Sequence, residues 1–240
     1  MVKPFLQALK SGLKNVYDVI LPRNCINCEI KLKKDEQYLC NSCFQKLILL
    51  KTHISDESIS PDKYYTKAYS AFKYDDVSKE CIHFFKYLSH TKMSDYLAYL
   101  AFDISGLELN TKYDYLIPVP LYKTRLRERG YNQAVLLANS FSKKLNIPVS
   151  TKIIYRSRHT DTQTQKSHEE RKTNVKNAFK LHKTAEVKGK KFLLVDDVIT
   201  TGSTMNSIAK LLKENKAKRI DLISFTWATT FTHQNHKNKS

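Results

Sequence analysis

The sequence contains no long hydrophobic run. None of its apolar segments approaches the roughly 18 residues that a membrane-spanning helix needs, so we expect no membrane insertion. Residues 1–22 contain several apolar side chains, but Lys10 and Lys14 interrupt them. This pattern predicts an amphipathic helix and not the continuous apolar core of an export signal. The sequence is therefore expected to belong to a cytoplasmic protein.

Acidic residues are scarce in the second half of the chain. Residues 1–120 hold 16 Lys and Arg against 14 Asp and Glu, whereas residues 121–240 hold 25 against 9. Most of the net charge of +18 therefore falls in the second half. A site for a polyanionic substrate and a surface for nucleic acid both fit this excess. An ordinary solvated lysine surface is the third interpretation.

The chain lacks the G-x-x-x-x-G-K-[ST] loop of P-loop proteins, but residues 192–204 hold another phosphate-type pattern. The apolar run from Phe192 to Val195 predicts a buried strand. Directly after it stand Asp196 and Asp197. A helix is predicted next, from the apolar spacing of Met205, Ile208, Ala209 and Leu212. A hydroxyl-rich turn joins strand and helix, and it consists of Thr200, Thr201, Gly202, Ser203 and Thr204.

A strand, a turn and a helix N-terminus together form an anion site. The first N–H groups of the helix and its dipole favour negative charge, and Gly202 permits close approach of a ligand to the backbone. The acids suit sugar hydroxyls, directly or through a hard cation. A strand that ends in acids and a helix capped by Ser or Thr are each common structural features. The joint pattern is much narrower, so we favour the functional interpretation.

Cysteines are few, and four of the five stand in two short pairs. Cys25 and Cys28 form one C-x2-C pair, and Cys40 and Cys43 form the other. Two such pairs suit a tetrahedral Zn²⁺ ion. Disulfides are the alternative, which the absence of an export signal disfavours. Cys81 stands alone among apolar residues and is expected to be a core thiol.

A basic segment follows a predicted strand that ends near Pro120. Lys123, Arg125, Arg127 and Arg129 offer guanidinium and ammonium groups for phosphate oxygens. An exposed basic loop entering a helix is the alternative. Residues 156–170 read as a long polar loop, in which His159 and His168 are expected to be solvated.

Strands alternate with helices along most of the chain. Strands are predicted over residues 66–74, 113–120, 152–155, 191–196 and 219–226. Helices are predicted over residues 77–88 and 93–104, from about 134 to 145, over 169–177 and over 203–215. This order predicts an α/β fold with a mostly parallel sheet flanked by helices, and ligands in such sheets bind at the carboxyl ends of the strands. We expect an N-terminal helix and cysteine module over 1–51, a main domain over 64–231 and a flexible tail over 232–240.

Several of these patterns together resemble the ComF/GntX family of phosphoribosyltransferase-like proteins. The resemblance covers residues 16 to 227, and its motifs come in the order found in that family. They are the four-cysteine ribbon, Ile-Pro-Val-Pro-Leu at 117–121, Arg-Gly-Tyr-Asn-Gln at 129–133, the loop from Arg158, Arg171 with Asn174 and Phe179, and residues 192–204. Lys73-Tyr74-Asp75 and Lys86-Tyr87 also resemble the family's upstream pattern. The resemblance implies a type I phosphoribosyltransferase fold with a small N-terminal zinc ribbon.

The resemblance also implies roles for individual residues. Asp196 and Asp197 would lie along the ribose hydroxyls of phosphoribosyl pyrophosphate (PRPP), and residues 200–204 would surround its 5′-phosphate. Mg²⁺ would accompany PRPP, and Zn²⁺ would be structural. The pyrophosphate side is assigned to Arg125, Arg127 and Arg129. A flexible lid is assigned to Arg158, Gln163 and Arg171, although Gln165 matches the family's glutamine equally well.

The implied reaction is displacement of pyrophosphate from PRPP by a nitrogen nucleophile. Thr200 stands where 6-oxopurine salvage enzymes carry an aspartate, and a threonine cannot transfer a proton near pH 7. Hypoxanthine and guanine are therefore disfavoured as acceptors, and the acceptor stays open. Whether the chain catalyses this reaction also stays open.

The family link to natural competence implies a role in DNA uptake. Single-stranded DNA and a helicase of the competence machinery are the candidate partners. The alternative function is a non-catalytic single-strand-binding competence factor, in which the PRPP site is vestigial or regulatory.

Overall fold

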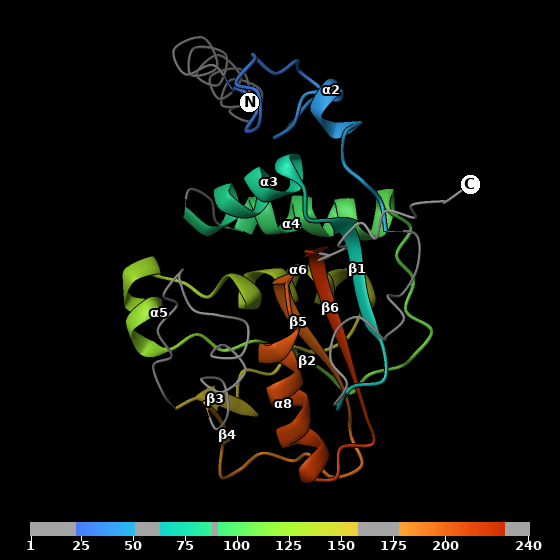
Figure 1. The fold of residues 1–240 in the computed structure, drawn as a ribbon, viewed down its shortest axis with the longest axis vertical. Coiled ribbons are helices and arrows are strands. Elements are labelled where there is room, and N and C mark those ends of the chain that lie inside the picture. Colours follow the sequence, from blue (N-terminus) through green and yellow to red (C-terminus); the bar gives the residue numbers. More distant parts are fainter. Residues whose placement is uncertain (1–22, 51–62, 88–90, 158–177, 229–240) are drawn as a thin grey trace, which may run out of the picture.

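The central sheet is formed by four parallel strands. The computed structural model describes residues 23–50, 63–87, 91–157 and 178–228. Its strands are ordered β1-β6-β5-β2, with β1 at Ala68–Lys73, β6 at Arg219–Trp227, β5 at Lys191–Ile199 and β2 at Tyr115–Pro118. The predicted α/β architecture with a parallel sheet is confirmed (Figure 1). The prolines at 118 and 120 explain why β2 is shorter than the predicted strand, because proline cannot donate a ladder hydrogen bond.

Helices cover both faces of this sheet. On one face, α6 (Gln133–Leu145) and α4 (Thr91–Tyr99) pack with α3 (Asp76–Tyr87) in one hydrophobic cluster. A π-helical turn, η1 (Leu100–Ile104), continues α4. On the other face, α8 (Ser203–Glu214) buries Met205, Ile208, Ala209 and Leu212, the four residues that the helical spacing predicted.

The inner strands are apolar on both faces, as expected for a sheet covered on two sides. Every residue of β6 after Arg219 is buried. The rings of Phe72 and Phe225 lie 5.1 Å apart between neighbouring strands. One acid, Asp221, is completely buried in β6. It accepts hydrogen bonds from the Arg219 Nε (2.9 Å), the Lys67 backbone N–H (3.0 Å) and the Tyr113 hydroxyl, so its charge is fully compensated.

Two elements differ from the sequence prediction. The basic segment forms a short helix, α5 (Lys123–Arg129), which Gly130 ends in the left-handed conformation at φ 78°. Helical periodicity could not reveal it, because α5 buries no residue completely. The second difference is an antiparallel pair formed by β3 (Ile154–Arg156) and β4 (Phe179–Leu181). The sequence predicted a strand near β3 but none at β4, which is only three residues long.

The cysteine ribbon packs against α3 and α4. Its short helix, α2 (Asn41–Phe44), has Cys40 as its N-cap, and an antiparallel bridge pairs Asn24 with Lys31. The ring of Tyr38 lies 5.8 Å from that of Phe84 in α3. Cys81 of α3 is fully buried, which confirms the predicted core thiol. Its burial raises the pKa of Cys81 to about 12.

Two predicted helices, over residues 1–22 and 169–177, lie outside the described residues. Among the helices that the structure does describe, none combines the length and the apolar character needed to cross a membrane.

Candidate functional site

The carboxyl ends of β5 and β2 lie next to each other at one edge of the sheet. Pro118 of β2 aligns with Val195 of β5, and the next residues of β5 are Asp196 and Asp197. The Asn132 side chain donates a 3.1 Å hydrogen bond to the Val119 carbonyl, which fixes the chain after β2 to the start of α6. The structure therefore places the proline segment and the acid pair at one edge, where parallel sheets bind ligands.

The turn between β5 and α8 is open at the helix N-terminus. Gly202 is the N-cap of α8 and adopts the left-handed conformation at φ 68°, which favours glycine. It has no side chain to cap the helix. The Thr201 and Ser203 hydroxyls lie 2.9 Å apart, and Thr200 is exposed. The N–H groups of the first helical turn, the hydroxyls and the helix dipole together suit a phosphate group.

One acid of the pair, Asp197, forms an ion pair with a lysine from a helix that is distant in the sequence. The Lys86 Nζ of α3 lies 3.0 Å from the Asp197 Oδ2, an ion-pair distance without hydrogen-bond geometry. The Asp197 side chain is only 5% exposed, so solvent screens this pair weakly. Burial alone would lower the pKa of Lys86, but the Asp197 carboxylate outweighs burial and raises it. Burial and the charge of Asp197 both raise the pKa of Asp196 well above its usual range.

The three predicted arginines do not share one face of α5. Positions 125 and 129 are one helical turn apart, whereas position 127 lies on the opposite side. Arg125 and Arg129 are accordingly half-buried, and Arg127 is exposed. The Arg129 guanidinium lies 5.5 Å from the centre of the Tyr87 ring, next to Lys86. It also donates a hydrogen bond to the Gln133 side chain. Arg129 thus lies beside the end of α3 that carries Lys86, Arg125 is half-buried, and Arg127 is exposed to solvent.

A further cation, Arg156, joins this group from the end of β3. Its guanidinium lies 5.5 Å from the centre of the Phe179 ring. Burial and the nearby charge of Arg125 lower the pKa of Arg156, while Asp196 opposes them. Arg125 and Asp196 are therefore both close enough to Arg156 to affect its charge. The site thus has cations from α3, α5 and β3 in the neighbourhood of two acids, beside a helix N-terminus.

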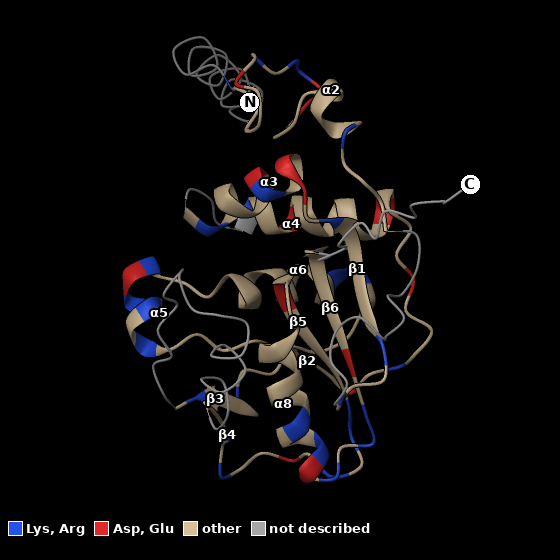
Figure 2. Ribbon diagram, viewed as in Figure 1, with Lys and Arg blue, Asp and Glu red and all other residues tan. Residues whose placement is uncertain are grey.

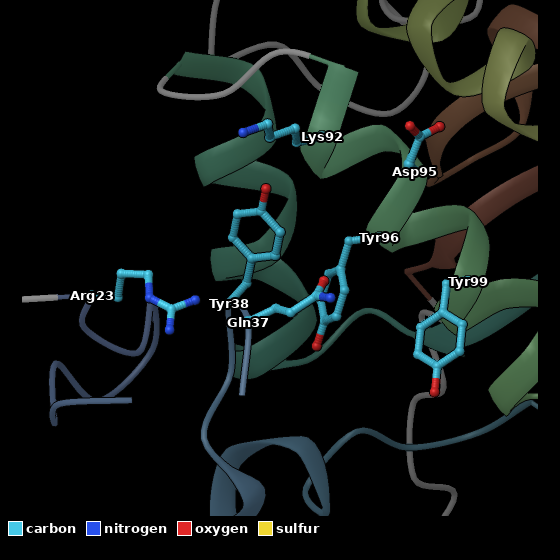
Figure 3. Close-up of a pocket in the computed structure, with 7 residues that line it drawn as sticks. All are labelled: Arg23, Gln37, Tyr38, Lys92, Asp95, Tyr96 and Tyr99. Atoms are coloured by element: carbon cyan, nitrogen blue, oxygen red, sulfur yellow. The ribbon is translucent and has the colours of Figure 1, made fainter. Parts of the chain in front are cut away.

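A separate hollow of about 680 Å³ lies between the cysteine ribbon and α4 (Figure 3). It is lined by Tyr38, Tyr96 and Tyr99 together with Arg23 and Lys92. The rings of Tyr38 and Tyr96 lie 5.0 Å apart, in contact with each other. None of the predicted site residues lines this hollow.

The four paired cysteines converge on one point. The Sγ atoms of Cys25, Cys28, Cys40 and Cys43 all lie within 4.8 Å of one another. A tetrahedral Zn²⁺ site with bonds of about 2.3 Å has sulfur atoms about 3.8 Å apart, and the Cys28 and Cys40 sulfurs are 3.6 Å apart. That separation excludes a disulfide bond between these two, which needs about 2.05 Å, and all four cysteines are free thiols in the structure. The cluster can therefore bind a metal ion such as zinc.

Nearby N–H groups support a charged sulfur cluster. The Cys40 N–H points at the Cys25 sulfur at 3.4 Å, and the Asn27 side chain donates to the Cys43 sulfur at 3.2 Å. Burial raises the pKa of Cys25, but the backbone N–H groups outweigh it and lower that pKa to about 7. Burial raises the pKa of Cys43 to about 12. A bound cation would replace the protons that such buried thiols otherwise keep.

Comparison with known proteins gives this arrangement a family context. Residues 131–236 match the phosphoribosyl transferase domain. Competence protein F of Haemophilus influenzae is 47% identical over 108 residues, which cover 45% of this chain and 47% of that protein. Competence protein ComFC of Bacillus subtilis is 27% identical over 211 residues, which cover 84% of this chain and 82% of that protein. The chain is thus ComF-like, in that it is similar to these competence proteins and matches the phosphoribosyl transferase domain over residues 131–236.

A third relative of the ComF-like chain is the DNA utilization protein YhgH of Escherichia coli K12. It is 40% identical over 118 residues, which cover 49% of this chain and 50% of that protein. The chain thus covers about half the length of two of these three relatives. Among solved structures, an adenine phosphoribosyltransferase aligns at 16% identity and a TM-score of 0.35, over 59% of this chain and 71% of that one.

The matched segment of the ComF-like chain includes the acid pair and residues 200–204, but it begins after α5. The lid residues Arg158, Gln163 and Arg171 lie outside the described residues. The sequence analysis missed Lys86 and Arg156 as site residues. The only signal for Lys86 was its place in the upstream Lys-Tyr pattern, and Arg156 had none beyond its charge.

Proposed function

We propose that the ComF-like chain binds PRPP together with Mg²⁺ at the carboxyl edge of the sheet. One observation supports this proposal most. The acid pair, the left-handed Gly202 and the start of α8, which no side chain caps, follow one another along the chain within a few residues. A ribose 5-phosphate needs acceptors for two hydroxyls and donors for one phosphate group, in this order along the pocket.

Different residues would bind different parts of PRPP, according to their chemistry. Thr201, Ser203 and the first N–H groups of α8 would donate to the 5′-phosphate. The carboxylates of Asp196 and Asp197 would accept from the ribose hydroxyls. Carboxylate oxygens are also hard-cation ligands, so the same pair fits Mg²⁺. When bound, Mg²⁺ would offset negative charge on the pyrophosphate.

Arg125 and Arg129 would take the pyrophosphate side of the pocket. Guanidinium groups bind phosphate oxygens through two parallel hydrogen bonds. Arg129 lies over the ring of Tyr87, next to the Lys86 that pairs with Asp197, and Arg125 is half-buried on the same face of α5. Transfer would form a bond between C1 of the ribose and the nucleophile and break the bond from C1 to the pyrophosphate oxygen. The growing negative charge on pyrophosphate would then be stabilised by these cations. The acceptor stays unassigned.

Calorimetric titration with PRPP and Mg²⁺ tests this proposal. The wild-type chain should bind, and Asp196→Asn/Asp197→Asn should bind at least about tenfold more weakly, because neutral amides lose charge-assisted hydrogen bonds. Equal affinity of the two proteins would refute the assigned pocket, and absence of binding to the wild type would refute the function.

A role in DNA uptake is the second candidate function. The relatives named competence protein F, ComFC and DNA utilization protein YhgH favour it. Single-stranded DNA and a helicase of the competence machinery would be the partners, in the cytoplasm. A non-catalytic single-strand-binding factor remains the alternative form of this function.

The cysteine cluster would hold a structural Zn²⁺. Four thiolate ligands leave no coordination position for a substrate or water. The ribbon would accordingly belong to an N-terminal unit over residues 1–51, distinct from the phosphoribosyl transferase unit over residues 64–231 and the tail over 232–240.

A further inference from the structure

Cations gather at the amino ends of the four parallel strands, opposite the acid pair. Parallel strands all begin at the same end of a sheet, so residues that precede β1, β6, β5 and β2 become neighbours. Each of these starts carries lysine or arginine, and the loops there are blue in Figure 2. The residues of this basic end face are Lys67, Lys112, Lys188, Lys190, Lys191, Lys216, Lys218 and Arg219.

Backbone hydrogen bonds hold this face together. The Lys218 N–H donates to the Lys190 carbonyl at 2.8 Å, and the Asp114 N–H donates to the Lys191 carbonyl at 2.8 Å. The Gly189 N–H donates to the Lys216 carbonyl at 2.9 Å. These lysines therefore lie on loops that backbone hydrogen bonds hold in place.

The face surrounds a hollow of about 580 Å³. Its lining combines Lys112, Lys191, Lys218 and Arg219 with the polar residues Thr66 and Asn110. Hydroxyl and amide groups next to ammonium groups suit phosphate and sugar oxygens.

Two acids at this end, Asp114 and Asp221, are already engaged. Asp114 accepts from the Lys191 N–H at 2.7 Å and pairs with Lys190 at 3.4 Å. Asp221 is completely buried and pairs with Arg219 at 2.9 Å. Within the described part of the chain, Lys112, Lys191 and Lys218 take part in no ion pair, and all three line the hollow.

These cations are too far from the acid pair to attract its ligand. Lys191 begins β5, and Asp197 follows six positions later on the same strand. At about 3.3 Å per residue the two ends are separated by about 20 Å. This separation exceeds the screening length of about 8 Å at physiological salt. The ribose-phosphate pocket therefore does not account for the basic end face.

We propose that the basic end face binds the phosphodiester backbone of a single-stranded nucleic acid. Neighbouring strands are about 4.8 Å apart, so their starts present a row of positive charges to a chain with one negative charge per nucleotide. The match needs no base contacts, so binding is independent of sequence. This surface deepens the DNA-handling candidate above and is independent of PRPP binding.

Fluorescence anisotropy with a labelled oligothymidylate tests this surface on the full chain. The variant Lys112→Gln/Lys191→Gln/Lys218→Gln should bind at least about tenfold more weakly at low salt. The slope of log affinity against log salt should fall by about 2, because each lost phosphate contact removes about 0.7 for single strands. PRPP affinity should not change, and Asp196→Asn/Asp197→Asn should bind the oligonucleotide like the wild type.

The matched control is Lys31→Gln/Lys33→Gln/Lys34→Gln, which removes the same charge from the exposed surface of the ribbon. It should leave the salt slope unchanged. Equal weakening by both triple variants, or none by the first, would overturn the assignment. Displacement of the oligonucleotide by polyglutamate at equal charge concentration would overturn it in favour of an acidic protein partner. If the triple variant melts early, the single exposed change Lys218→Gln should still lower the slope by about 0.7.

Discussion

At the scale of residues, the site combines a local pattern with partners that the sequence does not reveal. Asp196, Asp197 and Gly202 lie within seven positions, so their chemistry could be predicted from spacing alone. Lys86 reaches Asp197 only because α3 ends at the carboxyl edge of the sheet. A pair separated by more than a hundred positions has no periodicity, so sequence reasoning could not find it.

Replacing Asp196 with asparagine should stabilise the free protein at neutral pH. Its pKa is raised in the folded state, so folding loses stability as the pH rises from the ordinary value of 3.8 through the folded-state pKa. Asparagine does not titrate and avoids this loss. We expect a melting temperature about 2–4 °C higher near pH 7, and no difference below about pH 4. Differential scanning calorimetry across this pH range measures both.

The variant Asp114→Asn is the control, and we expect its melting temperature to shift in the opposite direction. A hydrogen bond from the Lys191 N–H and the nearby lysines lower the pKa of Asp114. Its carboxylate therefore stabilises the fold above pH 3.8, and that contribution disappears as the pH falls. Asp114→Asn should melt earlier at neutral pH. A shift in the same direction for both variants would contradict the assigned environments.

At the scale of elements, the strongly periodic segments were predictable and the weakly patterned ones were not. The buried run of β5 and the apolar face of α8 follow directly from residue spacing. By contrast, α5 contains a single apolar residue, Leu126, and lies on the surface. The β3–β4 pair depends on a contact between residues more than 20 positions apart in the sequence. Both unpredicted elements border the site. There the proposed function depends on charged side chains rather than on apolar contacts, so hydrophobic spacing does not reveal these elements.

The helical geometry of α5 separates the roles of its arginines. Arg125→Ala and Arg129→Ala should each weaken PRPP binding by about 10- to 100-fold, the effect of losing one hydrogen bond to a charged group, about 1.5–3 kcal/mol. Arg127→Ala should bind like the wild type, because its side chain points to solvent. Calorimetric titration with PRPP and Mg²⁺ checks all three. A loss in Arg127→Ala as large as that in Arg125→Ala would show that α5 is not used in this orientation.

At the scale of the whole molecule, the parallel strands place two groups of cations at opposite ends of the sheet. Every strand contributes its start to the basic end face, whereas the acid pair lies at the opposite end of β5. The excess of positive charge in residues 121–240 was visible in the sequence. Its division between two ends was not, because it depends on the strand order.

Removal of the metal should loosen more than the ribbon. Leu39 and Cys43 share one hydrophobic cluster with Val77 and Cys81 of α3. Chelation should therefore speed hydrogen exchange over residues 23–46 and also in α3, while β2 stays protected. Hydrogen exchange with mass spectrometry measures this. The variant Cys43→Ala should lose bound metal and Cys81→Ala should keep it. Full metal content in Cys43→Ala would exclude the four-cysteine site.

The helix α3 connects the cysteine ribbon with the acid pair. Its middle packs against the sulfur cluster, and its last turn carries the cation that pairs with Asp197. Its 12 residues form a helix about 18 Å long. We expect a displacement at one end of this helix to shift the other end. The Tyr131 hydroxyl clamps the same end of α3 through a 2.7 Å hydrogen bond to the Phe85 carbonyl. The ribbon and Lys86 are therefore connected through one helix, so we expect oxidation of the ribbon thiols to alter the electrostatics of a pocket that contains no cysteine.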